Sequence, residues 1–106
     1  MVGGVSRGDV WWVEFPGEGR RPAVVLSRDR AIPVLNKIIV APATRTMRGI
    51  PTEVALGPSD GMPDVCAASL DNVTMVSKRA LRTLICTLGP ERMREVCRAL
   101  SIAVDC

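Results

Sequence analysis

The sequence predicts a mainly β fold, a small barrel or strongly bent antiparallel sheet that ends in one C-terminal α-helix. Several short apolar segments bounded by glycine or proline precede a single segment with helical spacing. Closing or bending the sheet protects strand edges that a compact β domain would otherwise expose. At 106 residues the chain is expected to form a single domain, residues 1–106.

Seven short segments are rich in β-branched and apolar residues, and turn-forming residues separate most of them. They predict strands at residues 10–15, 22–27, 37–44, 52–56, 65–70, 72–76 and 81–88. Because proline has no N–H to donate, Pro22 is expected at the first position of its strand, and Pro42 requires an edge, a bulge or a strand end. Trp11 and Trp12 alternate along the first strand, so one indole should be buried and the other should lie near the surface.

The last segment changes from strand spacing to helical spacing. One helical face is expected to carry Met93, Val96, Cys97, Leu100 and Val104. Gly89 as the N-cap and Pro90 at the first helical position form a start signal. We therefore expect one terminal helix that covers the sheet.

The composition excludes several classes of catalytic site. The chain has no histidine and no tyrosine, which removes Ser–His–Asp, Cys–His and paired-histidine mechanisms. The carboxylates are scattered, and the glycines form neither a P-loop nor a dinucleotide motif, so we expect no metal and no cofactor. The apolar runs are short and the N-terminal segment lacks the apolar core of a signal peptide, which predicts a cytoplasmic protein that does not enter the membrane.

The four cysteines form no C-x-x-C pair. A reducing compartment favours free thiols over disulfides. Cys66, Cys86 and Cys97 lie within apolar patterns and are expected to be buried, whereas Cys106 at the end of the chain is expected to be exposed.

Basic residues are concentrated between Arg20 and Arg48. That segment contains seven arginine or lysine residues and one acidic residue, a net charge of +6 in a chain whose total is +3. Such a segment favours a polyanion or an acidic protein segment as the partner. A solvated positive surface without a partner is the alternative interpretation.

Arginine and hydroxyl groups are the catalytic chemistry that remains. Arg21 precedes a strand entered through Pro22, and Thr44 closes the strand at 37–44, so adjacent strands would bring the two side chains together. An arginine grips phosphate oxygens with its forked donors and stabilises the charge of a phosphorane, and a threonine hydroxyl adds another donor. The alternative is a solvated arginine and a threonine that only favours the strand.

Five short motifs occur in order along nearly the whole chain. They are RGDVWWVEF (7–15), RPAVVLS (21–27), IIVAPAT (38–44), PTEVAL (51–56) and LDNV (70–73). In this order they resemble the motifs of the MazF/PemK toxins of type II toxin–antitoxin systems. The resemblance implies an SH3-like barrel, a homodimer, and metal-independent, sequence-specific cleavage of single-stranded RNA. It also implies that Arg21 and Thr44 are the catalytic pair, that the RNA 2′-OH attacks the phosphate to leave a 2′,3′-cyclic phosphate and a 5′-OH, and that an acidic antitoxin neutralises the toxin.

The chain departs from the family pattern at two places. The first loop is only PGEGR, residues 16–20, so Glu18 corresponds loosely to a longer loop, and Thr74 stands where the family often has a basic residue. Asn72 takes the place of the family's amide residue. The expected RNA contacts are Glu18, Arg20, Arg45, Arg48 and Asn72.

Two other hypotheses remain open from the sequence. A non-catalytic toxin of the same fold, a DNA gyrase poison of the CcdB type, would act through the terminal helix, which is apolar on one face and basic on the other. A protein whose pocket has lost its activity would persist as a partner-binding domain. For either toxin hypothesis the implied antitoxin is acidic and partly disordered, and would lie across the basic segment.

Overall fold

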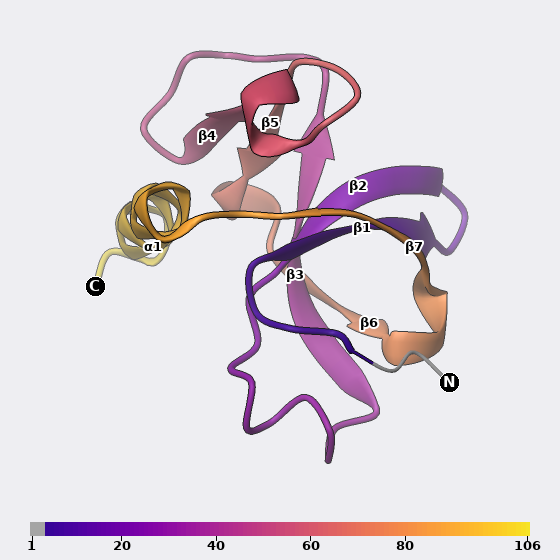
Figure 1. Cartoon of the computed structure of the whole chain (residues 1–106). Helices are drawn as coiled ribbons and strands as arrows, with labels where there is room; N and C mark the ends of the chain where they lie inside the picture. Colours follow the sequence, from indigo (N-terminus) through magenta and orange to yellow (C-terminus); the bar gives the residue numbers. More distant parts are fainter. Residues whose placement is uncertain (1–3) are drawn as a thin grey trace.

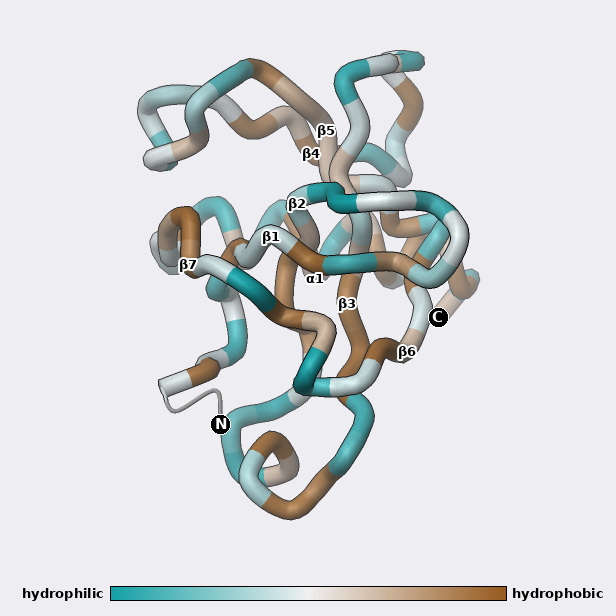
Figure 2. The backbone as a smooth tube through the Cα atoms, turned by 90° about the vertical axis from the view of Figure 1, so that its right-hand side faces the viewer, coloured by the Kyte–Doolittle hydropathy of each residue, from teal (hydrophilic) through white to brown (hydrophobic). Residues whose placement is uncertain are grey.

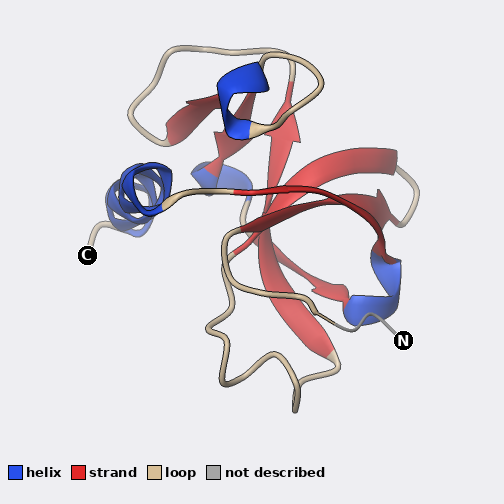
Figure 3. Cartoon of the chain, viewed as in Figure 1, coloured by secondary structure: helices blue, strands red, loops and turns tan. Residues whose placement is uncertain are grey.

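In the computed structural model, which describes residues 4–106, a curled antiparallel sheet forms most of the molecule (Figure 1). The strands are β1 (Asp9–Phe15), β2 (Gly19–Val25), β3 (Lys37–Thr44), β4 (Glu53–Leu56), β5 (Cys66–Ser69), β6 (Thr74–Ser77) and β7 (Leu81–Thr87), and the helix is α1 (Pro90–Val104). Single 3₁₀ turns lie at Pro58–Asp60, Leu70–Asn72 and Lys78–Ala80. Figure 3 shows the strands curling around one another with α1 at one side, which confirms the predicted mainly β fold with a terminal helix.

The central strand β3 changes its partner along its length. On one side it pairs with β2, and on the other side residues 37–40 pair with β6 while residues 43–44 pair with β5. The full order is β4-β5-β3-β2-β1-β7, with β6 beside the first part of β3. Pro42 lies between the two ladders, where its missing N–H breaks neither of them. The sheet therefore divides at the position where the sequence predicted an interruption.

The start of β2 differs from the prediction. The strand begins at Gly19, so Pro22 lies inside it, opposite Trp12 of β1. The ladder between β2 and β3 begins only at Ala23. Pro22 is tolerated because it precedes this second ladder, so no hydrogen bond to β3 is lost.

The segment between β5 and β6 also differs from the prediction. Residues 70–72 form a 3₁₀ turn, and the strand predicted from residue 72 begins at Thr74. The Asn72 side-chain amide donates to Ser69 Oγ at 2.8 Å. This local side-chain hydrogen bond stabilises the turn, in place of the extended conformation that the apolar pattern favoured.

Two groups of buried side chains fill opposite faces of the sheet. The helix-side core, which includes Val10, Val24 and Val96, lies between the sheet and α1. The barrel-side core lies within the curl of the sheet and includes Trp11, Val13, Val25, Ile38 and Val40. Successive residues of β1 and β2 alternate between the two cores, as the geometry of a strand requires. Figure 2 shows the apolar course of β3 through the middle of the molecule.

The two adjacent tryptophans have different environments, as predicted. Trp11 is buried in the barrel-side core, whereas Trp12 is partly exposed on the other face. The Trp11 indole N–H donates to the buried carboxylate of Asp9 at 3.2 Å. Asp9 also accepts from the Ser6 amide and the Thr87 hydroxyl, both at 2.9 Å. These bonds satisfy a buried charge and fix the start of β1 against β7.

Helix α1 begins where the sequence predicts, with Gly89 as the N-cap and Pro90 in the first turn. The helix contacts β4 and the 3₁₀ turn at residues 70–72. The residues packed on the helix-side core are Met93, Val96, Ala99, Leu100 and Ala103. The prediction was wrong for Cys97 and Val104, which are exposed, because Ala99 and Ala103 occupy the contact face beside Met93, Val96 and Leu100 instead. Among residues 4–106, no helix has both the length and the apolar character required to cross a membrane.

The structure contains free thiols with three degrees of burial. Cys66 is buried and Cys86 is partly buried, whereas Cys97 and Cys106 are exposed. Burial raises the pKa of the Cys66 and Cys86 thiols, and the negative charge of Asp60 adds to the rise. The prediction of a buried thiol is therefore confirmed for Cys66, confirmed only in part for Cys86 and wrong for Cys97, whereas Cys106 is exposed as predicted.

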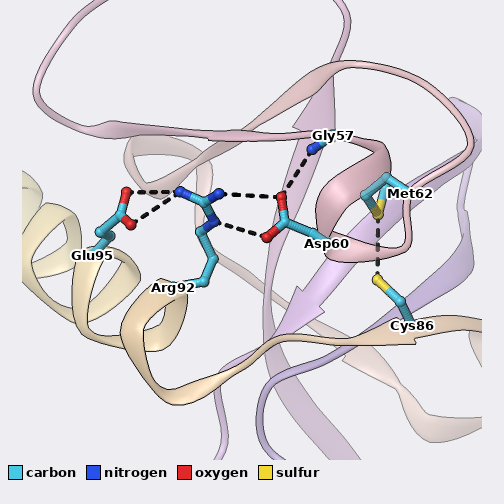
Figure 4. A network of polar contacts seen from close by, with 6 residues as sticks. All are labelled: Gly57, Asp60, Met62, Cys86, Arg92 and Glu95. Atoms are coloured by element: carbon cyan, nitrogen blue, oxygen red, sulfur yellow. Dashed lines mark hydrogen bonds and ion pairs between the residues drawn. The ribbon is translucent and has the colours of Figure 1, made fainter.

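An ion pair fastens the loop between β4 and β5 to α1 (Figure 4). Arg92 Nε donates to Asp60 Oδ1 at 2.9 Å, Arg92 Nη1 donates to Glu95, and the Gly57 amide donates to Asp60 Oδ2 at 3.0 Å. The Asp60 side chain is 11% exposed. Burial raises the pKa of this carboxyl, but the hydrogen bonds from Arg92 and Gly57 and the Arg92 charge outweigh it and hold the pKa below its ordinary value.

The same loop is packed closely against β7. Met62 is buried, and its sulfur lies 3.6 Å from Cys86 Sγ (Figure 4). Gly61 has φ +98°, and a Cβ atom built on it would lie 2.7 Å from Cys86 Cβ. This position therefore requires glycine for two reasons, the backbone conformation and the lack of space.

Gly61→Ala is expected to lower the free energy of unfolding by about 2 kcal/mol or more, because left-handed strain and a steric clash with Cys86 add together. Gly49→Ala is the matched control, since Gly49 has φ +68° but nothing within 4 Å of its added Cβ. The control should lose only about 1 kcal/mol. Urea unfolding of both variants measures the difference, and equal losses would show that Cys86 imposes no steric limit.

Asp60→Asn is expected to destabilise the protein by about 1.5 kcal/mol near pH 7, with a smaller effect in acid. Because the folded pKa of Asp60 lies below its ordinary value of about 3.9, the unfolded chain binds the proton more readily. The stabilisation is therefore complete above about pH 4 and is lost as the pH falls through the folded pKa. Urea unfolding between pH 3 and pH 7 measures the difference between wild type and variant.

Asp64→Asn is the control for this experiment, because Asp64 forms an exposed ion pair with Arg45. Its effect should stay below about 0.5 kcal/mol at every pH. An Asp60→Asn effect that is the same at pH 3 and pH 7 would contradict the assigned role of the charge.

Candidate active site

Arg21 and Thr44 lie at the neighbouring ends of two paired strands. Ala23 of β2 pairs with Pro42 of β3, and the same register extended by two residues along each strand places Arg21 opposite Thr44. Side chains at every second position share a face, so Arg21 follows Ala23 and Val25 on the barrel-side face. The antiparallel register thus brings together two residues that are 23 positions apart in the sequence.

Both residues line a cavity of about 400 Å³ at the open end of the barrel-side core. We call this the first cavity. Phe15 and Val76 contribute buried apolar surface to it, and Glu18 and Asn72 contribute polar groups. The other lining residues are Pro16, Pro42, Ala43, Ser69, Thr74 and Met75.

A second cavity of about 350 Å³ shares Arg21 and Thr44 with the first. It is lined on β1 and β2 by Trp12, Arg20 and Pro22, and on the β3 side by Ala43 and Arg45. The loop before β5 contributes Met62, Pro63 and Asp64, and β5 itself contributes Cys66. The predicted pair therefore lies on the wall between two hollows, and each hollow is large enough for a planar ring.

The polar groups of this pair remain available to a ligand. Arg21 Nη2 lies 3.9 Å from Glu18 Oε1, and the Arg21 side chain is 48% exposed. At this distance and exposure the ion pair is weak, so the guanidinium keeps its donors for another anion. Thr44 Oγ1 accepts from the Thr46 amide at 3.2 Å, which leaves the hydroxyl hydrogen free to donate. Together the two side chains can grip the oxygens of a phosphate.

The other predicted contact residues are divided among three places. Glu18 and Asn72 line the first cavity, and Arg20 and Arg45 line the second. Both arginines already have carboxylate partners: Arg20 pairs with Glu14 at 3.4 Å, and Arg45 pairs with Asp64 at 2.9 Å. Arg48 lines neither cavity and lies in the exposed loop after β3, where its amide donates to Glu53.

The basic segment does not form one continuous surface. Arg20 and Arg21 lie at the start of β2, whereas Arg28 and Arg30 follow its end. A seven-residue strand separates the two groups by roughly 20 Å. Three arginines of the predicted basic segment therefore line the site: Arg20, Arg21 and Arg45. The other basic residues of the segment line neither cavity.

Several residues of the two cavities were not predicted from the sequence. Ser69, Thr74 and Met75 reach the first cavity because β5 and β6 both pair with β3. Asp64 reaches the second cavity through a loop whose path no local pattern defines. The alternation along β1 predicted that one of the two tryptophans would lie near the surface, but it did not identify Trp12 as that residue and did not predict the neighbouring cavity.

The polar groups that line the two cavities include three guanidiniums, three hydroxyls, one amide, two carboxylates and the thiol of Cys66. Among residues 4–106, no group of three or more histidine, cysteine, aspartate or glutamate side chains is arranged to hold a metal ion. The positive charge at the centre of the site comes from Arg21. The arrangement suits an anionic ligand with a planar group on either side.

Known proteins of one family match both the sequence and the fold. The sequence model for the PemK-like, MazF-like toxin of type II toxin–antitoxin systems matches residues 6–104. A probable endoribonuclease MazF5 of Mycobacterium tuberculosis is 51% identical over 102 residues, which cover 95% of this chain and 94% of the relative. A probable endoribonuclease MazF2 of the same species is 34% identical, and the match covers 96% of this chain and 100% of the relative.

Solved structures extend this agreement to three dimensions. The Mycobacterium tuberculosis toxin MazF-mt6 superposes with a TM-score of 0.85 at 27% identity, covering 92% of this chain and 96% of that one. An endoribonuclease in complex with its cognate antitoxin, from a mycobacterial species, gives a TM-score of 0.85 at 28% identity over 95% of each chain. These similarities confirm the fold that the resemblance implied. The chain belongs to the PemK-like, MazF-like toxins of type II toxin–antitoxin systems.

Proposed function

We propose that this chain, an endoribonuclease of the MazF-like family, cleaves single-stranded RNA at specific sequences and without a metal ion. The observation that supports the proposal is the position of Arg21 and Thr44 on the shared wall of two cavities. A phosphate held by this pair would have its flanking nucleotides directed into a cavity on each side. Stacking platforms and separated bases are features of sequence-specific recognition of single-stranded RNA.

The reaction uses the nucleophile of the RNA itself. The ribose 2′-oxygen attacks the adjacent phosphorus and gives up its proton to water, the P–O5′ bond breaks, and the O5′ oxygen takes up a proton from water. The products are a 2′,3′-cyclic phosphate and a 5′-OH. Arg21 stabilises the charge of the phosphorane and can pass a proton, while Thr44 donates to a phosphate oxygen. Because Arg21 supplies the positive charge at the phosphate, the step needs no divalent ion.

The remaining polar residues bind the RNA on either side of this phosphate. Asn72 and Glu18 in the first cavity contact base edges. Arg20 and Arg45 at the second cavity attract backbone phosphates, and Arg48 extends this attraction along the loop after β3. Thr74 lines the first cavity in place of a basic residue, so phosphate binding depends more on the arginines of the second cavity.

The protein acts in the cytoplasm, where its RNA substrates are present, and an acidic, partly disordered antitoxin neutralises it. Two solved neighbours are complexes: an endoribonuclease with its cognate antitoxin, and MazE–MazF from Deinococcus radiodurans. An acidic segment laid across Arg20, Arg21 and Arg45 would occupy the phosphate site and exclude RNA. The relatives are named endoribonucleases, so the comparisons do not favour the gyrase hypothesis.

The active form is expected to be a homodimer. Large apolar side chains are exposed at the surface, among them the cross-strand neighbours Ile39 and Met75, which are 39% and 55% exposed, and a dimer interface would cover such residues. Light scattering should give twice the 11.4 kDa mass of the chain. A monomer mass at all micromolar concentrations would contradict this expectation.

Arg21→Ala and Thr44→Ala test the catalytic assignment. The purified protein should cut a long mixed-sequence RNA in the presence of EDTA and leave cyclic phosphate ends. Removing one donor that stabilises a developing charge lowers the rate by roughly 100-fold or more, which is the loss expected for Arg21→Ala. Sequencing of the digest and analysis of the 3′ ends measure both cut positions and chemistry.

Arg94→Ala is the matched control, because Arg94 is an exposed arginine of α1 outside both cavities. It should cleave at the wild-type rate. Full cleavage by Arg21→Ala would reject the assignment, and a loss of only about tenfold would restrict Arg21 to a role in binding. A wild-type protein that cuts no RNA would support the hypothesis of a lost activity.

A further inference from the structure

We infer that the second cavity binds the base of a nucleotide beside the cleaved phosphate and selects bases that carry an amino group, namely adenine, cytosine or guanine, over uracil. The inference rests on the proposed function, because it assigns a ligand to one side of the same phosphate site. Three features carry it: the partly exposed aromatic face of Trp12 on β1, the carboxylate of Asp64 at the rim, and the contacts that hold the loop of Asp64 in place.

The aromatic face belongs to Trp12. Trp11 occupies the barrel-side core, so the alternation of β1 turns Trp12 to the opposite face, where it lines the second cavity and stays partly exposed. Pro22 lies directly opposite Trp12 on β2 and also lines the cavity. An indole in this position can stack on a base, since stacking on aromatic side chains is tolerant of base identity. Trp12 therefore supplies affinity for a base without choosing which one.

Asp64 is the residue that discriminates between bases in this inference. Its Oδ2 accepts from Arg45 Nη2 at 2.9 Å, and its side chain is 61% exposed, so the carboxylate is oriented by Arg45 yet accessible from the cavity. An ionised carboxylate only accepts hydrogen bonds. Adenine, cytosine and guanine each offer an exocyclic amino group to such an acceptor, and guanine adds its neighbouring N1–H. Uracil instead presents carbonyl oxygens on both sides of its N3–H, which a carboxylate repels.

The arginines at the same rim do not reverse this preference. Arg45 donates to Asp64, and Arg20 donates to Glu14, so both already have carboxylate partners. Arg21 lies on the wall shared with the first cavity and holds the phosphate in the proposed mechanism. Asp64 is therefore the rim group whose chemistry distinguishes one base edge from another.

The position of Asp64 is fixed by contacts elsewhere in its loop. Met62, two residues earlier, is buried and touches Cys86, and Asp60 is bound to Arg92 of α1. Cys66, two residues later, is buried at the start of β5. Because the loop is held on both sides of Asp64, the carboxylate stays at a fixed distance from Trp12 when a base binds. Selection of a base by its edge requires such a fixed distance.

The test is a cleavage map of a mixed-sequence RNA with wild type, Asp64→Asn and Asp105→Asn. Wild-type sites are expected to exclude uracil at one fixed position beside the cut. Asp64→Asn replaces an acceptor by a group that both donates and accepts, so the preference against uracil should fall roughly tenfold and new sites with uracil should appear. Asp105→Asn removes an exposed charge at the far end of α1 and should leave the map unchanged.

Trp12→Leu keeps an apolar side chain but removes the aromatic face. It should slow cleavage roughly tenfold at all sites and leave the base preference intact. An Asp64→Asn map identical to that of wild type would overturn the inference. A Trp12→Leu rate equal to wild type would overturn the stacking role.

A binding experiment separates this inference from the proposed function. Short 2′-O-methyl oligonucleotides lack the free 2′-OH, so they bind without being cut, and a set that differs at one position at a time measures base preference directly. We expect wild type to bind the oligonucleotide with uracil roughly tenfold more weakly than the others, and Asp64→Asn to bind all of them equally. This result supports the inference even if the protein cuts no RNA. Equal binding of all four oligonucleotides by wild type overturns the inference. The proposed function still stands in that case if wild type cleaves RNA and Arg21→Ala does not.

Discussion

The site depends on one constraint, the antiparallel register between β2 and β3. With Ala23 opposite Pro42, Arg21 and Thr44 meet at the strand ends on the same face. A slip of one residue would turn one of the two side chains to the opposite face of the sheet. The register is enforced by burial, because Val24 must enter the helix-side core while its neighbours enter the barrel-side core. Packing of the interior therefore determines which polar groups meet at the surface.

The second constraint acts on the loop from Gly57 to Asp64, which forms one wall of the second cavity. This loop has little regular structure of its own, and its position is set by the Asp60–Arg92 ion pair and by the packing of Gly61 and Met62 on Cys86. The ion pair joins the loop to α1, so the C-terminal helix helps to shape a cavity that it does not line. In this way the helix contributes to the site through the loop, even though its own charged face lies elsewhere.

The sequence could predict the features that depend on local pattern. The strand that carries Trp11, the helix start at Pro90 and the end of β3 at Thr44 all follow from alternation, capping and turn residues. It could not predict features that depend on packing between distant segments. Asp64 reaches the site through a loop path with no periodicity, and α1 packs on the core through Ala99 and Ala103 where the apolar pattern favoured Cys97 and Val104.

In the proposed mechanism, the solvent exposure of the site would link base recognition to catalysis. In the free protein Arg21 is 48% exposed, so water screens its charge and weakens its attraction for a phosphate. Bases seated in the two cavities on either side would cover the guanidinium and the phosphate together and displace that water. Electrostatic stabilisation of the phosphorane grows as the local dielectric falls. A poorly seated base leaves the pair solvated, so a wrong sequence would lower the rate of the chemical step as well as the affinity.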